Sequence, residues 1–256
     1  MFYIEIFTVI CLGLVLGSFA TALIYRVPKK LPWGAERSAC PECKANLGAL
    51  DLIPVLSWCL SGGKCRHCSN KISSRYPLTE IVSGVLCLLI YLVYGLNISS
   101  LFLIASVPFL IALCVIDLRH MILPNQLVFI LMGVGGVRLG YLFYSGDNLQ
   151  ATELLTVYIA GAFTYGFISW FLGFVLTKIL KRNSLGFGDV KFFIVAGLWL
   201  GLNALPYFMI LSGTLAIAFA LCWRMVFKQD VFPFGPALIV SFYSLLLLQG
   251  SFSFLN

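Results

Sequence analysis

Long apolar stretches alternate with short polar segments along most of the chain. A helix needs about 20 mostly apolar residues to cross the hydrocarbon core of a bilayer. By this criterion the pattern predicts about eight transmembrane helices, and therefore an all-α polytopic membrane protein. The predicted spans cover residues 4–25, 78–95, 99–117, 124–144, 153–177, 189–203, 206–226 and 235–251, of which the sixth is the shortest.

One polar segment is much longer than the others and covers residues 27–77. It divides the chain into a first transmembrane helix over residues 1–26, the loop itself, and a seven-helix membrane domain over residues 78–256. The loop is the one sizeable part that the pattern places in water, so we expect it to form a small domain of its own.

The composition supports a membrane protein. Hydrophobic residues make up 61% and charged residues 11% of the 256 residues, whereas about a quarter of the residues of a soluble domain are charged.

The first apolar run has no Lys or Arg ahead of it and no clear small-residue cleavage site, so we expect a retained span rather than a signal peptide. The basic residues behind the net charge of +7 lie in loops between the spans. The excess of Lys and Arg in cytoplasmic loops and their attraction to anionic lipid head groups explain this charge. We find no motif for binding nucleic acid.

The basic residues predict the orientation of the chain in the membrane. Of the 17 Lys and Arg residues, only Arg138 falls on the side opposite the long loop. Cytoplasmic loops carry an excess of Lys and Arg, so the loop is predicted to be cytoplasmic and both termini to lie outside. Asp117, at the end of the third span, and Asp189, at the start of the sixth, are then both at the cytoplasmic ends of their helices.

The long loop contains two Cys-x-x-Cys pairs separated by 21 residues. This spacing is typical of a Zn²⁺ site made by four thiolates. Such a site is structural, because four thiolates leave no open position for water, and the loop has few apolar residues with which to build a core. Two disulfides are the alternative, which a reducing cytoplasm disfavours. The predicted ligands are Cys40, Cys43, Cys65 and Cys68, and we expect Cys59 and His67 to be bystanders.

Two aspartates at a membrane boundary are the candidate catalytic residues. An ionisable residue in such a place is costly and indicates a functional site. We predict that Asp117 and Asp189 meet and act as an aspartic protease pair, in which an ionised carboxylate activates water and a protonated one donates to the substrate. Gly186 and Gly188 flank the turn that carries Asp189 and would leave room for an extended substrate backbone.

Other interpretations of these acids remain open. Each aspartate could cap a helix, although at the carboxyl end of a helix Asp117 would oppose the macrodipole. A transporter or channel that uses Asp117 and Asp189 as a cation site is the alternative function, but no internal repeat is visible. A non-catalytic assembly factor that docks through the loop is a third hypothesis. For Glu80 we expect the ordinary role of an acid at a helix start, and a role in binding substrate or cofactor is the less favoured alternative.

Several stretches, taken in order, resemble the type IV prepilin peptidases, a family of bifunctional membrane enzymes also called prepilin leader peptidase/N-methyltransferases. The resemblance covers most of the chain, and six ordered matches are more specific than any one of them. The matching stretches are Gly17–Phe19 with Ile24–Pro28, the paired cysteine motifs, Arg75–Glu80, Asp117 with Ile122–Asn125, Gly186–Lys191 and Pro233–Pro236.

The resemblance implies a GxGD aspartic endopeptidase of the bacterial inner membrane. It would cut the basic leader of prepilins or pseudopilins after a glycine on the cytoplasmic side, then methylate the new amino terminus from S-adenosylmethionine. Thr21 and Asn125 depart from the family pattern, in which Asn and Asp are expected, and Thr21 bears on the second activity. The sequence contains no Gly-rich cofactor motif, so the residues that bind the methyl donor are not predicted.

Overall fold

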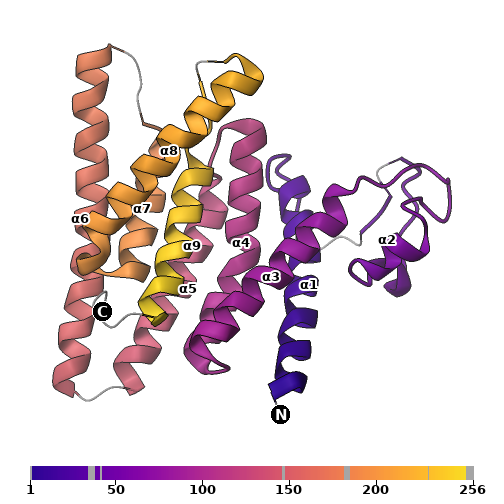
Figure 1. Cartoon of the computed structure of the whole chain (residues 1–256), viewed down its shortest axis with the longest axis horizontal. Helices are drawn as coiled ribbons and strands as arrows, with labels where there is room; N and C mark the ends of the chain where they lie inside the picture. Colours follow the sequence, from indigo (N-terminus) through magenta and orange to yellow (C-terminus); the bar gives the residue numbers. More distant parts are fainter. Residues whose placement is uncertain are drawn as a thin grey trace. The chain divides into compact units, whose positions relative to one another are not determined.

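The computed structural model of the chain consists of helices and connecting loops (Figure 1). It describes residues 2–33, 38–40, 42–145, 148–181, 185–229 and 231–251. Over these ranges the β contacts are two single bridges, both inside the long loop. The helices are α1 (Phe2–Arg26), α2 (Leu56–Leu60), α3 (Arg75–Tyr94), α4 (Ile98–His120), α5 (Asn125–Ser145), α6 (Asn148–Leu180), α7 (Phe187–Leu200), α8 (Leu205–Phe227) and α9 (Gly235–Ser251), with short 3₁₀ helices η1 (Ala49–Leu52) and η2 (Leu202–Ala204).

The eight predicted spans correspond to α1 and α3 to α9, which confirms the predicted all-α polytopic class. In the described part of the chain, six of these helices are long and apolar enough to cross a membrane. The other two are shorter, because α7 has 14 residues and α9 has 17. The prediction also ended the third span too early, since α4 continues three residues beyond Asp117 to His120.

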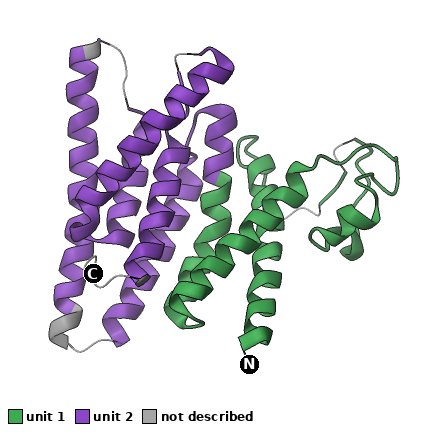
Figure 2. Cartoon of the chain, in the orientation of Figure 1, with its two compact units in different colours: residues 1–112 green, residues 113–256 purple. Residues whose placement is uncertain are grey.

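The chain forms two compact units, residues 1–112 and residues 113–256 (Figure 2). Unit 1 contains α1, the long loop, α3 and the first part of α4, and α1 packs closely along α3. Two glycines allow this approach: a Cβ atom on Gly13 would lie 2.8 Å from the Gly84 Cα, and one on Gly17 would lie 2.6 Å from the Glu80 Cα. Small residues at a helix crossing are a common device of membrane proteins. The division at residues 26 and 77 stays a prediction.

Unit 2 contains the rest of α4 and helices α5 to α9. Helix α7 packs against α6 at Gly161 and Gly197, where a Cβ atom on either glycine would collide with the backbone of the other helix. On its other sides, Trp199 of α7 donates a hydrogen bond to the Leu131 carbonyl of α5 at 3.0 Å, and Phe192 packs edge-to-face on Phe242 of α9. Helix α7 is therefore the packed centre of this unit.

Helix α7 is too short to cross a membrane by itself, because 14 residues span about 21 Å and the hydrocarbon core is about 30 Å thick. Trp199 and Leu200 at its end are buried, so their carbonyl groups need donors from the protein. Arg138 of α5 is buried and donates to the Trp199 carbonyl at 3.5 Å. Gln249 of α9 donates to the Leu200 carbonyl at 2.6 Å. Both side chains cap the carboxyl end of α7.

Replacing Arg138 by Met is expected to destabilise unit 2 by about 1–3 kcal/mol, because a buried carbonyl loses its donor. The guanidinium also lies over the Trp199 ring at 5.5 Å, and this contact would be lost. Thermal unfolding of the purified protein in detergent measures the effect. Arg119→Met, at an exposed position, is the matched control. Equal melting temperatures for the two variants would contradict this role of Arg138.

Candidate active site and metal centre

Asp117 lies in the last turn of α4 and is only 4% exposed. Its Oδ2 atom accepts a hydrogen bond from the backbone N–H of Gly235 at 2.8 Å. Gly235 is the first residue of α9, and the two residues are 118 positions apart in the chain. The Pro233–Pro236 stretch, one of the stretches that carry the family resemblance, therefore supplies a hydrogen-bond donor to the Asp117 carboxylate.

This contact explains how a negative charge is tolerated at the carboxyl end of α4. The macrodipole of α4 disfavours an anion there, as the sequence indicated. The amino terminus of α9 offsets this effect, because its unsatisfied N–H groups and positive dipole end favour an anion. Asp117 is thus positioned by one helix and stabilised by another.

Asp189 occupies the third position of α7, within the first turn of the helix. Its Oδ2 atom accepts a hydrogen bond from the backbone N–H of Gly186, the residue before the helix, at 3.2 Å. The sequence allowed Asp189 to be the cap residue itself, but the helix starts two residues earlier, at Phe187. Both aspartates therefore accept a hydrogen bond from a backbone N–H at the start of a helix of unit 2.

Both aspartates lie in unit 2, and the segments that carry them pack against each other. The glycines beside Asp189 serve close packing: a Cβ atom on Gly186 would lie 2.9 Å from the Asp189 carboxylate, and one on Gly188 would lie 3.1 Å from the Leu123 Cβ. The turn that carries Asp189 is thus pressed against the segment that follows Asp117.

A polar contact between α5 and α7 adds to this arrangement. The ammonium group of Lys191 donates a hydrogen bond to the Asn125 side-chain oxygen at 2.8 Å, and it lies over the rings of Phe129 and Phe187. Asn125 was noted from sequence only as a departure from a family pattern. Its amide oxygen accepts from Lys191, so Asn125 joins the start of α5 to the start of α7.

Gly235→Ala is expected to reduce the activity of this site by about 10²-fold, the size of effect that misplacement of a reacting group by about 1 Å produces. The added methyl group would lie 2.7 Å from Oδ2 of Asp117, so the carboxylate has to move. The control is Gly213→Ala in α8, where a Cβ atom would meet nothing within 4 Å. The initial rate of substrate cleavage at equal protein level measures the effect, and equal rates for both variants would contradict it.

The four predicted cysteine ligands come together in unit 1. The Sγ atoms of Cys40, Cys43, Cys65 and Cys68 all lie within 4.8 Å of one another. None of the four forms a disulfide, and the cluster could hold a metal ion. Cys59 and His67 are exposed and lie outside the cluster, in agreement with their expected role as bystanders.

The two cysteine pairs are built by the same local geometry. In the first, the Cys40 N–H donates to the Ala45 carbonyl at 3.0 Å, and Lys44 adopts a left-handed conformation with φ of 59°. In the second, the Cys65 N–H donates to the Asn70 carbonyl at 2.9 Å, and Ser69 has φ of 57°. Each pair is thus a tight turn that places its two sulfur atoms on one side.

Backbone N–H groups of these turns point at sulfur. Those of Cys43 and Glu42 lower the pKa of the Cys40 thiol to about 7, against the opposing effect of burial. The N–H groups of Cys68 and His67 lower the pKa of Cys65 in the same way. The thiolate is the form that binds metal, so the backbone favours the coordinating state at Cys40 and Cys65. The pKa of the Cys68 thiol is raised to about 11 despite the hydrogen bond from the Asn70 backbone, because burial and the neighbouring thiols oppose its ionisation.

The chain matches two protein-family models that agree with its two parts. Residues 11–94 match the Bacterial Peptidase A24 N-terminal domain, and residues 104–221 match the Type IV leader peptidase family. The cysteine cluster falls in the first match, and both Asp117 and Asp189 fall in the second.

Curated relatives cover nearly the whole chain. It is 30% identical to the prepilin leader peptidase/N-methyltransferase of Vibrio cholerae serotype O1, over 94% of each chain. It is 31% identical to the type 4 prepilin-like proteins leader peptide-processing enzyme of Escherichia coli O78:H11, over 94% of this chain and 93% of the relative. The enzyme of Neisseria gonorrhoeae is 33% identical, over 90% and 86%. The chain therefore belongs to the type IV leader peptidase family. No solved structure matches it.

Proposed function

We propose that the chain is a prepilin peptidase, a membrane aspartic endopeptidase that uses Asp117 and Asp189 as its catalytic pair. The observation that carries this proposal is that each carboxylate accepts a backbone N–H at the start of a helix of unit 2, in segments that pack against each other, in a member of the type IV leader peptidase family. The substrate is the precursor of a type IV pilin or pseudopilin, and the bond cut is the one after the glycine that ends its basic leader.

The paired carboxylates support hydrolysis without a covalent intermediate. The ionised member takes a proton from water, and the water oxygen attacks the carbonyl carbon of the scissile bond. The protonated member donates its proton to the carbonyl oxygen. As the C–N bond breaks, the leaving nitrogen takes the proton that the first carboxylate had received from water, and a hydroxyl of the tetrahedral intermediate returns a proton to the second. Like charges in close proximity cannot both be ionised easily, so the pair shares one proton and titrates as a unit.

The surroundings of the aspartates favour this chemistry over a cation site. Gly235 and Gly186 present N–H donors to the two carboxylates. A cation such as Ca²⁺ or Mg²⁺ requires a shell of oxygen ligands instead. Backbone donors hold carboxylates in fixed positions, which is what an acid–base pair needs.

The cysteine cluster fits a structural Zn²⁺ ion. A Zn–S distance of about 2.3 Å in a tetrahedral site corresponds to sulfur atoms about 3.8 Å apart. Cys40 and Cys68 have their Sγ atoms 3.9 Å apart. Four thiolates would complete the coordination and hold together a loop whose short helices bury no residue. Zinc therefore serves the fold of this loop.

The second activity in this proposal is N-methylation of the new amino terminus. The amine nitrogen attacks the methyl carbon of S-adenosylmethionine, the sulfur keeps the electron pair of the broken C–S bond, and the amine loses a proton. S-adenosylmethionine supplies only the methyl group. The proposed setting is the bacterial inner membrane, with both termini outside and the aspartates and zinc loop on the cytoplasmic side, in contact with membrane lipid and not with nucleic acid.

The test uses purified protein in detergent with S-adenosylmethionine and a peptide that carries a basic leader, Gly, Phe and an apolar helix. Mass spectrometry follows loss of the leader and a methyl-sized gain at the new amino terminus. Both changes are expected. Cleavage without the gain would restrict the function to a peptidase. An uncut peptide with folded protein would contradict the proposal and favour the cation-site alternative.

A further inference from the structure

Unit 1 contains a cavity of about 570 Å³ between the end of α1, the cysteine loop and the start of α3. Its volume lies in the range of about 300–1,000 Å³ that small-molecule sites occupy. The proteolytic chemistry proposed above uses only residues of unit 2, so it leaves this cavity without a role. Thr21, which departs from the family pattern, is one of its lining residues.

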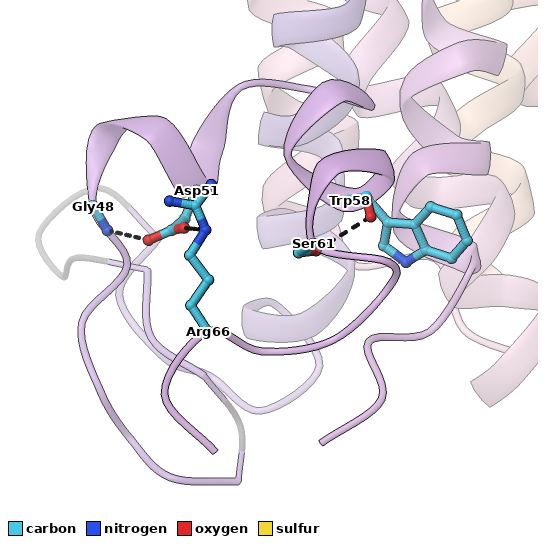
Figure 3. A network of polar contacts seen from close by, with 5 residues as sticks. All are labelled: Gly48, Asp51, Trp58, Ser61 and Arg66. Atoms are coloured by element: carbon cyan, nitrogen blue, oxygen red, sulfur yellow. Dashed lines mark hydrogen bonds and ion pairs between the residues drawn. The ribbon is translucent and has the colours of Figure 1, made fainter. Parts of the chain in front are cut away.

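A buried carboxylate lines the cavity. Glu80 is 8% exposed, and its Oε2 atom accepts a hydrogen bond from the backbone N–H of Val55 at 2.8 Å. Gly17 of α1 presses against its Cα atom, which fixes the backbone there. Among the described residues the one ion pair, between Arg66 and Asp51, does not include Glu80 (Figure 3). A buried charge without an ionic partner is costly, so a cationic ligand would stabilise it.

The bond from Val55 to Glu80 holds a strained turn. Val55 has φ of 62°, which is an outlier for a β-branched residue, and the Leu56 N–H donates to the Pro54 carbonyl two residues back at 2.6 Å. Such strain persists only where the surroundings enforce it, and it is concentrated at functional sites. Helix α2 follows directly, so Glu80 also determines where α2 begins.

The position of Trp58 on α2 is fixed from two sides. Its indole N–H donates to the Ile72 carbonyl at 3.1 Å. A Cβ atom on Gly63 would lie 2.9 Å from the ring, so the chain passes against it without a side chain between them. Figure 3 shows Trp58 on this short helix and Ser61 just after its end, and both line the cavity. The cavity therefore has a fixed aromatic wall as well as a buried anion.

The remaining charges of the cavity favour a ligand that carries both signs. Besides the paired Arg66 and Asp51, the wall includes the acid Glu42 and a larger number of basic residues, Arg26, Lys44, Lys64 and Lys71. A strongly basic leader peptide would be repelled by them. An amino-acid ligand with a carboxylate, an ammonium and a second cationic centre fits better: the carboxylate suits the basic wall, and the cations suit Glu80 and the Trp58 ring.

We propose that this cavity of unit 1 binds S-adenosylmethionine, with the Glu80 carboxylate and the Trp58 ring recognising its positive charge. The inference rests on the methylating half of the proposed function. It identifies where the methyl donor binds, which no motif in the sequence indicates. S-adenosylhomocysteine, which lacks the sulfonium charge, is expected to bind more weakly to the same cavity.

The test is isothermal titration of the full-length protein in detergent with S-adenosylmethionine. Glu80→Gln keeps an oxygen that can accept from Val55 and removes the charge. The dissociation constant is expected to rise at least about tenfold in this variant, because a buried ionic partner is lost. Glu153→Gln, at an exposed position of α6, is the matched control and should bind as the wild type does. Peptide cleavage by Glu80→Gln is expected to be unchanged.

A second measurement does not depend on any variant. Radiolabelled S-adenosylmethionine cross-linked to the wild type by ultraviolet light is expected to label the segment of residues 38–80. Label on residues 113–256, or equal affinity of Glu80→Gln and wild type, would overturn the site while leaving methylation intact. Absence of donor binding by a protein that cleaves would overturn both the site and the methylating function. Loss of leader-peptide binding alone in Glu80→Gln would assign the cavity to the leader and overturn the proposal.

Discussion

Replacing either Asp117 or Asp189 by Asn is expected to lower the rate of leader cleavage by at least about 10²- to 10⁴-fold, the contribution of a positioned acid–base group. The amide oxygen of Asn can still accept the hydrogen bond from Gly235 or Gly186, so the fold should survive. The charge and the shared proton are lost. The measurement is the initial rate of leader release at equal protein content in membranes.

The control for these variants is Glu153→Gln, which removes a carboxylate from an exposed position and should leave the rate unchanged. Because the two aspartates are expected to act as one unit, the double variant should be no slower than the slower single variant. Normal cleavage by both single variants would end the catalytic-pair hypothesis. A loss of protein from the membrane in either variant would instead indicate a structural role.

Cys65→Ser is expected to remove the bound metal completely and to open the cysteine loop. Cys65 is 6% exposed at the centre of the cluster, and coordination by four thiolates is worth about 10–16 kcal/mol in small zinc domains. Neither η1 nor α2 buries a residue of its own, so the loop has little else to hold it. Metal content by mass spectrometry and the rate of tryptic cleavage at Lys64 and Lys71 measure the two effects.

Cys222→Ser is the matched control for this experiment, because Cys222 is an exposed thiol on α8. It should keep the full metal content and the protease resistance of the wild type. Retention of metal by Cys65→Ser would contradict the four-thiolate site. Loss of metal with an intact, protease-resistant loop would show that zinc is not what stabilises this part of unit 1.

Features that depend on neighbouring residues could be predicted from the sequence. The cysteine pairs are local turns, so their spacing alone indicated that four sulfur atoms would gather. The apolar runs likewise indicated the helices, because a run of about 20 apolar residues within one segment is enough to indicate a membrane-spanning helix. The glycines around Asp189 marked the turn at the start of α7.

Contacts between distant segments could not be predicted from the sequence. The hydrogen bond from Gly235 to Asp117 joins residues 118 positions apart, and no pattern in either segment points to the other. The burial of Arg138 follows from the early end of α7, which hydropathy does not show because the apolar run continues past Leu200. Glu80 was underestimated for the same reason, since its partner Val55 lies in the loop. Such residues are recognised only once the helices are packed.

The central claim is that the prepilin is cut between Asp117 and Asp189, and photocross-linking tests it most directly. A prepilin peptide with benzoylphenylalanine in place of the Phe after the cleavage glycine would be bound to the inactive Asp117→Asn protein and irradiated. Peptide mapping is predicted to place the label in residues 113–256, in the segments around Asp117, Asp189 and Gly235. Label confined to residues 1–112 would contradict the account.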